Sequence, residues 1–164
     1  MSREQERKKY EIQLNVENEN DLYNSFDKFN NSLSDDVYSY INNKTDFSHI
    51  TDTIKINISS KNKIDNKKFV NAYNKYINEQ INLLKKESKF NTTKQIWLLC
   101  IGVLFIGFSL MLNDKINVIL LEIISTIGSF SVWESANSFL IERKILAGRK
   151  LKLIKLKNAE LNFN

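Results

Sequence analysis

Two apolar segments, separated by only three residues, constrain this chain more than any other feature of its sequence. The segments are residues 96–112 and 116–133, and Glu122 is the only charged side chain in either of them. A helix over the first segment would span roughly 25 Å, slightly less than a hydrocarbon core of about 30 Å. We therefore predict a transmembrane hairpin of two antiparallel helices. A buried helix pair in a soluble core is the alternative.

The basic residues that flank the hairpin predict its orientation. Lysines precede the first span at positions 85–94, and a densely basic segment follows the second span at positions 143–157. The connection at 113–115 carries a single lysine. Lysine and arginine are retained on the cytoplasmic side of a membrane. We therefore predict a protein of the cell inner membrane whose two termini both lie in the cytoplasm. The polar N-terminal residues predict no signal peptide.

The second span carries a polar stripe. Helical spacing places five polar residues along or beside one side of it, namely Glu122, Ser125, Thr126, Ser129 and Asn137. A carboxylate is costly in hydrocarbon, so we predict that copies of the chain associate around it, with a tetramer as one candidate size. Two interpretations follow. In the first, the stripe lines a water-filled pore. In the second, the oligomer is inert, and Glu122 is protonated or hydrogen-bonded between its helices. Small residues in and just after this span, such as Gly128 and Ser135, would let helices approach closely.

The remaining sequence predicts a small α+β domain. Apolar residues alternate with polar ones at 10–16 and 53–59, and a shorter alternation occurs at 159–163, so we expect about three strands. Short helical stretches are expected around Leu22, Phe26 and Phe29, and again from Ser34. A long amphipathic helix is expected from Asp65, continuing toward the first span without a linker.

After the second span, residues 138–157 predict a basic helix. Its apolar residues Leu140, Ala147, Leu151 and Ile154 fall on one side. The predicted fold is therefore an α+β cytosolic domain fused to a two-helix transmembrane hairpin. Its parts are the N-terminal region 1–90, the hairpin 91–136, and the segment 137–164, whose helix and strand return to the cytosolic domain.

Composition excludes several kinds of chemistry. The chain has one cysteine and one histidine, so it can form neither an intrachain disulfide nor a zinc site of the Cys/His type. None of its four glycines belongs to a phosphate-binding loop. No pair of acids stands in a context that suggests acid–base catalysis. We predict no enzymatic activity, no catalytic residues, no metal and no cofactor.

A group of lysines and tyrosines suggests a ligand site on the α+β domain. These residues lie near the second strand and the start of the long helix: Lys55, Lys61, Lys63, Lys67, Lys68, Tyr73 and Tyr76. Lysines and aromatic rings at a helix N-terminus suit phosphates and stacked bases, so a nucleotide ligand is one interpretation. The other is a solvated face whose lysines balance nearby acids or lie on anionic lipid headgroups.

The layout of the whole chain resembles a group of small bacterial two-span membrane proteins of anti-phage defence. The segment GSFSVWESANSFLIERKILAGRKLKLIKLKNAEL (128–161) carries most of the likeness, with a tryptophan and an acid at the end of a span followed by a basic helix. Within that group the chain is similar to the membrane effectors of the Hailong system. The resemblance implies an oligomeric ion channel that is held closed by a single-stranded oligodeoxyadenylate made by a partner nucleotidyltransferase. Loss of this ligand would open the pore and depolarise the infected cell.

Three classes of function remain open from the sequence. The first is a membrane effector that forms an oligomeric ion channel or pore gated by a nucleotide or oligonucleotide. The second is a membrane-anchored scaffold or regulator that binds a protein partner and has no pore. A holin-like or immunity protein is the third. All three place membrane lipid among the partners of the chain.

Overall fold

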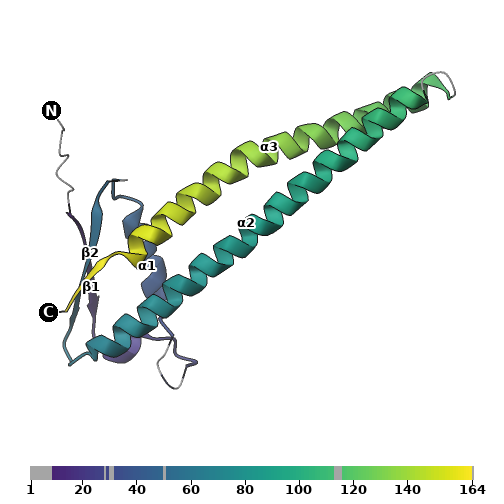
Figure 1. Cartoon of the computed structure of the whole chain (residues 1–164). Coiled ribbons are helices and arrows are strands. Elements are labelled where there is room, and N and C mark those ends of the chain that lie inside the picture. Colours follow the sequence, from purple (N-terminus) through teal and green to yellow (C-terminus); the bar gives the residue numbers. More distant parts are fainter. Residues whose placement is uncertain (1–8, 28, 30–31, 50, 113–115, 164) are drawn as a thin grey trace, which may run out of the picture. The chain divides into compact units, whose positions relative to one another are not determined.

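The computed structural model describes residues 9–163 apart from 28, 30, 31, 50 and 113–115, so the predicted external connection lies outside the described residues. In chain order the elements are β1 (Lys9–Val16), the 3-10 helix η1 (Glu19–Leu22), α1 (Asp35–Thr45), β2 (Thr53–Ser60), α2 (Asn66–Met111), α3 (Val118–Lys157) and β3 (Glu160–Phe163) (Figure 1).

The chain divides into two compact units. The first, here called the sheet unit, comprises Met1–Asn82 and Lys150–Asn164. The second, here called the hairpin unit, comprises Leu83–Arg149. Helices α2 and α3 are each continuous through the division, so each contributes residues to both units.

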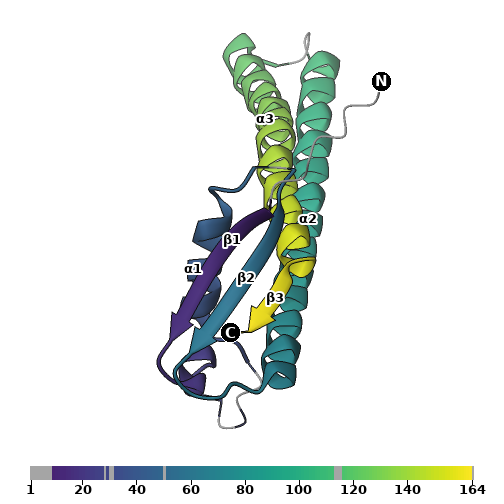
Figure 2. The same cartoon turned by 90° about the vertical axis from the view of Figure 1, so that its left-hand side faces the viewer.

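The sheet has three parallel strands in the order β1-β2-β3, which Figure 2 shows side by side. In this register Ile12 of β1 lies beside Ile56 of β2, and Ile56 lies beside Leu161 of β3. Because side chains alternate along a strand, these residues share one face, and the isoleucines of β2 on it are fully buried. The prediction of three strands with helices is confirmed.

Helix α1 and residues of α2 and α3 complete the core of the sheet unit. Ser34 caps α1, since its side chain accepts a hydrogen bond from the main-chain nitrogen of Asp36 at 3.3 Å. The buried apolar residues of these helices in this unit are Val37 and Ile41 of α1, Phe69, Ala72, Tyr73 and Ile77 of α2, and Leu153 and Leu156 of α3. The other face of the sheet carries polar side chains, which is typical of a sheet covered on one side only.

The helical stretch expected around Leu22, Phe26 and Phe29 is largely absent from the structure. Among the described residues of this stretch only η1 is helical, and Leu22 is buried while Phe26 and Phe29 are 94% and 77% exposed. The side chains of Asn24 and Asp27 accept hydrogen bonds from the main-chain nitrogens of these two phenylalanines, at 3.0 Å each. Such turns compete with helical hydrogen bonds, so this prediction was wrong beyond Leu22.

The last turns of α3 contribute residues outside the predicted apolar side to the core. Leu153 and Leu156 are 7% and 0% exposed, whereas Leu151 and Ile154 are 42% and 41% exposed. The hydroxyl of Tyr73 donates to the main-chain carbonyl of Leu156 at 2.8 Å, which ties this turn of α3 to the core. The predicted apolar side of the segment remains largely exposed in a single chain.

Candidate functional site

The chain has two helices that are long and apolar enough to cross a membrane, α2 and α3. Only 17% of the most apolar window of α2 is buried within the protein, and only 11% of that of α3. The core helix of a soluble protein would be mostly buried. Exposed apolar windows of this length therefore favour a membrane environment, in agreement with the predicted spans.

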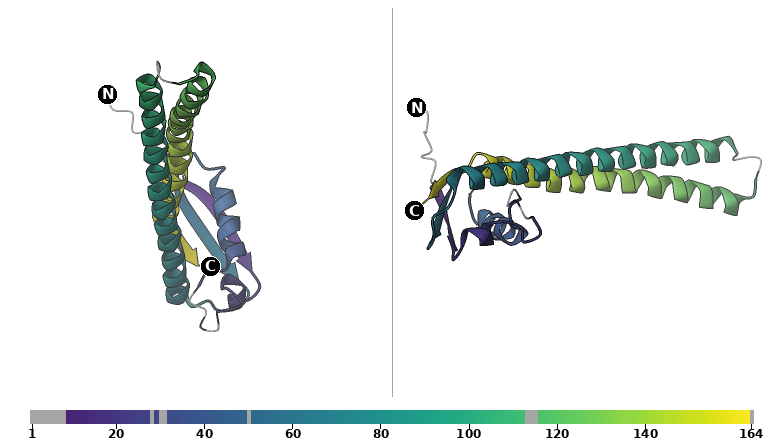
Figure 3. Two further views of the ribbon diagram at one scale, coloured as in Figure 1. Left: turned by 90° about the vertical axis from the view of Figure 1, so that its right-hand side faces the viewer. Right: turned by 90° about the horizontal axis from the view of Figure 1, so that it is seen from below.

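Within the hairpin unit, α2 and α3 run side by side and approach each other at two glycines (Figure 3). A Cβ atom placed on Gly102 would lie 2.6 Å from Cγ2 of Val132 and 2.8 Å from the carbonyl oxygen of Gly128. A Cβ atom placed on Gly128 would lie 2.8 Å from Cγ1 of Ile106. Only glycine fits such a backbone contact, as is common where helices pack in membranes.

Residues spaced seven apart extend this contact along both helices. On α2 they are Gln95, Gly102 and Ser109, all buried, and on α3 Gly128 and Ser135 are buried while Glu142 is half-buried. A seven-residue repeat keeps one side of each helix toward its partner. We call this contact the seam.

The seam contains polar contacts at one end. The Gln95 side chain donates to the Glu142 carboxylate at 3.2 Å, and the Ser135 hydroxyl donates to the main-chain carbonyl of Gln95 at 2.9 Å. Ser138 is also buried there, and its hydroxyl has no hydrogen-bond partner among the described residues. The seam is therefore polar at the end next to the basic segments. At its centre, where Gly102 and Gly128 meet, it is not polar.

The predicted stripe lies on the outside of this pair of helices. Glu122, Thr126, Ser129 and Asn137 are exposed, and Ser125 is half-buried. At about 100° per residue, Glu122 lies roughly 120° around α3 from the seam. The stripe and the seam are thus on different sides of one helix. In a single chain nothing among the described residues covers Glu122.

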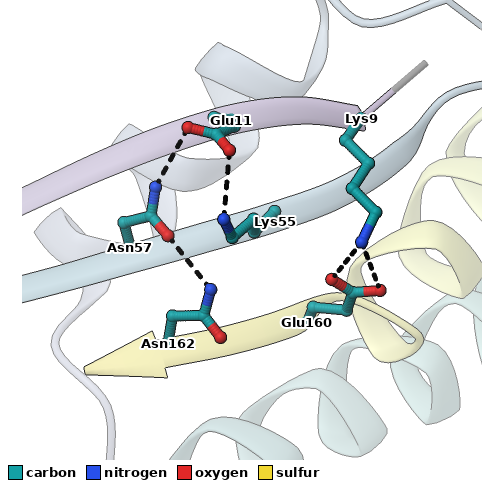
Figure 4. Close-up of polar contacts among 6 residues, drawn as sticks. All are labelled: Lys9, Glu11, Lys55, Asn57, Glu160 and Asn162. Carbon is teal, nitrogen blue, oxygen red and sulfur yellow. Dashed lines mark hydrogen bonds and ion pairs between the residues drawn. The ribbon is translucent and has the colours of Figure 1, made fainter. Parts of the chain in front are cut away.

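The predicted lysines do not form one cluster in the sheet unit. Lys55 lies on the open face of the sheet, where its ammonium group is 3.1 Å from the carboxylate of Glu11 (Figure 4). Lys61 follows the other end of β2, about 20 Å away at the usual rise of a strand. It forms an exposed ion pair with Glu17 at 3.1 Å. The structure therefore separates Lys55 from the other lysines of the predicted set.

The open face of the sheet is filled by polar side chains that contact one another. Glu11 also accepts from the amide of Asn57 at 3.3 Å, and Lys9 forms an ion pair with Glu160 at 3.0 Å (Figure 4). The described strands place no aromatic side chain on this face. Since single-stranded nucleic acid is bound on sheets through stacked aromatic rings, this face is not a stacking platform.

The amino end of α2 is occupied by the protein's own carboxylate. Asp65 accepts hydrogen bonds from the main-chain nitrogens of Lys67 and Lys68, at 3.0 and 3.1 Å. The ammonium group of Lys68 lies 5.1 Å from the centre of the Tyr23 ring. Asp65 therefore occupies two of the amide groups that a phosphate at this helix end would contact.

Lys63 and Lys67 have exposed side chains with no carboxylate at ion-pair distance in the described part of the chain. Lys67 lines a shallow, open depression of about 290 Å³, together with Asn66, Val70 and Asn71 of the first turns of α2. These two lysines are the exposed members of the predicted set without a carboxylate partner, so they remain able to contact an anionic ligand.

The two predicted tyrosines have structural roles. Tyr73 is 1% exposed, and burial raises the pKa of its phenol, which stays protonated and donates to Leu156. Tyr76 packs on Tyr38 with ring centres 4.8 Å apart and donates to the Asp35 carboxylate at 2.6 Å. Burial and this carboxylate raise the pKa of Tyr76. Stacking of a base on Tyr73 is thus excluded by its burial.

Among the described residues there is no group of histidine, cysteine, aspartate or glutamate side chains that could hold a metal ion. Comparison with protein-family models, with curated proteins and with solved structures finds no match to this chain. Sequence reasoning missed the α2 half of the seam. The seven-residue spacing of Gln95, Gly102 and Ser109 is the signal that would have shown it.

Proposed function

We propose that this chain is a two-span protein of the cell membrane that assembles as a homo-oligomer around an ion pathway. The hairpin unit crosses the bilayer. The sheet unit is a cytosolic domain, and both termini lie on the cytosolic side. The basic segments on either side of the hairpin support this orientation. The scarcity of buried residues in both apolar windows supports the membrane location.

The exposed carboxylate of Glu122 is the observation that carries the proposal. Lipid around Glu122 would cost on the order of 2–3 kcal/mol on insertion scales. Helix α2 cannot cover it, because α2 lies against the seam on another side of α3. Further copies of the chain provide the cover, and a ring of Glu122, Thr126 and Ser129 from several copies gives a polar path for ions.

The continuity of α2 and α3 supports control of this path by the sheet unit. The same uninterrupted helix carries Glu122 and the core residues Leu153 and Leu156. Likewise α2 carries Gly102 of the seam and Phe69 and Tyr73 of the core. A ligand that repacks this core therefore acts on both membrane helices without an intervening linker.

We propose that this ligand is a nucleotide or oligonucleotide and that the protein is an effector of anti-phage defence. The resemblance described above supports both statements and names oligodeoxyadenylate as the first ligand to try. Lys63 and Lys67 are the contacts we propose for it, because both are exposed and have no carboxylate partner among the described residues. With so few cations we expect weak binding unless several copies of the chain share one polymer.

Replacing Glu122 tests the pore. We expect Glu122→Gln to insert and assemble but to change cation selectivity or conductance in liposomes, because the residue loses its charge and keeps its size. Glu122→Leu should reduce flux several-fold further, because the polar path is interrupted. Glu134→Gln is the matched control, since it removes one carboxylate from α3 outside the predicted span.

Two results would contradict the pore. Normal flux in both Glu122 variants would show that Glu122 does not line the path. Absence of ion flux from assembled wild-type protein, with and without ligand, would leave a membrane anchor instead of a channel.

Replacing two lysines tests the ligand site. We expect Lys63→Gln/Lys67→Gln to weaken binding of a fluorescent oligodeoxyadenylate several-fold at low salt, and less at high salt, because exposed phosphate contacts are screened. Lys55→Gln is the control, since this lysine is already paired with Glu11. Equal binding by the double variant and the control would place the ligand elsewhere.

A further inference from the structure

The hairpin unit carries an excess of cations next to its apolar windows. Outside the two predicted spans and the connection 113–115, it has seven basic residues against three acidic ones. Glu87 is occupied by Arg149, at 2.9 Å, and Glu142 accepts from Gln95. Five lysines are exposed and have no ion-pair partner among the described residues: Lys85, Lys86, Lys89, Lys94 and Lys144.

The sheet unit provides an internal comparison. Four of its lysines, Lys9, Lys55, Lys61 and Lys152, form ion pairs with carboxylates of the same unit. Other lysines of this unit, such as Lys63 and Lys67, have no carboxylate partner, but the unit as a whole is nearly balanced, with sixteen basic residues against fourteen acidic ones. The base of the hairpin unit has more than twice as many basic as acidic residues, which points to an anionic partner outside the chain.

Large apolar side chains lie among these cations. On α2, Trp97 and Phe90 are 66% and 71% exposed, and on α3, Trp133 and Leu140 are 68% and 67% exposed. Phe90 and Leu140 lie outside the predicted spans, so lipid tails around the spans do not account for their exposure. A partner for this surface has to offer apolar and anionic groups together.

The two helices present these groups in the same order. Seven residues outward from the tryptophan comes a large apolar residue, and eleven residues outward comes a lysine: Trp97, Phe90 and Lys86 on α2, and Trp133, Leu140 and Lys144 on α3. Helical spacing keeps each set on one side of its helix. From tryptophan to lysine is about 16 Å along the axis, and a lysine side chain can extend back toward the bilayer by several ångströms.

We infer that this surface, Lys85–Trp97 of α2 with Trp133–Lys144 of α3, binds anionic phospholipid in preference to zwitterionic lipid. Tryptophan lies at the headgroup level, the apolar residue lies in the interfacial layer, and the lysines contact headgroup phosphates. Each lysine of a polybasic segment beside a membrane raises the affinity for anionic lipid by about fivefold at most. The inference rests on the proposed membrane insertion of the hairpin but not on the presence of a pore.

The two tryptophans make the test direct, because they are the only ones in the chain and both lie within this surface. The full chain is reconstituted in phosphatidylcholine vesicles that contain brominated phosphatidylglycerol or brominated phosphatidylcholine, and quenching of tryptophan fluorescence is compared. We expect each brominated phosphatidylglycerol molecule to quench tryptophan fluorescence several-fold more strongly than each brominated phosphatidylcholine molecule. Lys86→Gln/Lys89→Gln/Lys144→Gln should lose at least about threefold of that preference. The control Lys9→Gln/Lys44→Gln/Lys55→Gln removes the same charge from the sheet unit and should keep the preference.

Equal quenching by the two brominated lipids in the wild type would overturn the inference, as would an unchanged preference in the Lys86/Lys89/Lys144 variant. If an added oligodeoxyadenylate abolished the wild-type preference, the cations would belong to a soluble polyanion and the lipid assignment would be wrong. Lipid preference without ion flux would refute the proposed pore alone. Ion flux without lipid preference would refute this inference alone.

Discussion

Leucine at position 128 is expected to prevent α2 and α3 from packing along the seam. Even a Cβ atom there would lie 2.8 Å from Cγ1 of Ile106 and 3.0 Å from both the carbonyl oxygen of Gly102 and the nitrogen of Ile106. Two of these three atoms belong to the main chain of α2, which cannot rotate away as a side chain can. Overpacking typically costs 1–3 kcal/mol, and about 3 kcal/mol or more is expected for a branched side chain against backbone. Gly128→Ala should show a smaller loss in the same direction.

Disulfide crosslinking measures this packing. Cysteines at Gln95 and Ser135, whose hydroxyl contacts the Gln95 carbonyl, are introduced in a Cys100→Ser background. We expect rapid crosslinking in the parent and little in the Gly128→Leu variant. Gly107→Leu is the matched control, because a Cβ atom at Gly107 meets nothing within 4 Å. Crosslinking of the Gly128→Leu variant at the parent's rate would show that the helices do not meet at this glycine.

The strands of the fold were predictable because their burial follows a period of two. Alternation at 10–16 and 53–59 corresponds to β1 and β2 within one residue at each end, and Ser34 was recognised as a cap from its side chain and the acids after it. Local patterns of this kind depend on neighbours in the sequence. The parallel order of the strands depends on the whole chain, and no local pattern contained it.

The wrong predictions about Phe26, Phe29 and Tyr73 have a common physical cause. The spacing of residues in the sequence does not show which local hydrogen bonds or core contacts form. Phe26 and Phe29 have helical spacing, but the side chains of Asn24 and Asp27 hold the backbone in turns. Tyr73 has the composition of a ligand contact, yet it lies where α2 crosses the core and is buried. Spacing alone does not show which member of a pattern is covered by another element.

The candidate site shows the same limit. The polar stripe with Glu122 was visible in the sequence, because its residue types are rare in an apolar span. The side of α3 that contacts α2 was not, since α3 has small residues on more than one side. The close approach of Gly102 to Gly128 decides between them and leaves the stripe on the outside.

In the sheet unit, Phe69→Ala is expected to have the largest effect on stability. Phe69 is fully buried, stacks on Tyr73 with ring centres 6.1 Å apart, and meets the edge of Phe163 at 5.8 Å. Loss of a buried phenylalanine costs about 3–5 kcal/mol, because a cavity replaces these contacts. Phe26→Ala is the matched control: Phe26 is 94% exposed, so the same change should cost less than about 0.5 kcal/mol.

Hydrogen exchange of the full chain in lipid nanodiscs measures both changes. Because Phe69 joins α2 to β3 through Phe163, amides of β2 and β3 should exchange about 100-fold faster or more in Phe69→Ala, and within about twofold of wild type in Phe26→Ala. Phe69→Leu, which keeps most of the volume, should fall between them and serves where the alanine variant does not fold. Similar exchange in the Phe69 and Phe26 variants would mean that Phe69 is not a core residue. The route from the sheet core to α2 that the proposed gating requires would then be lost as well.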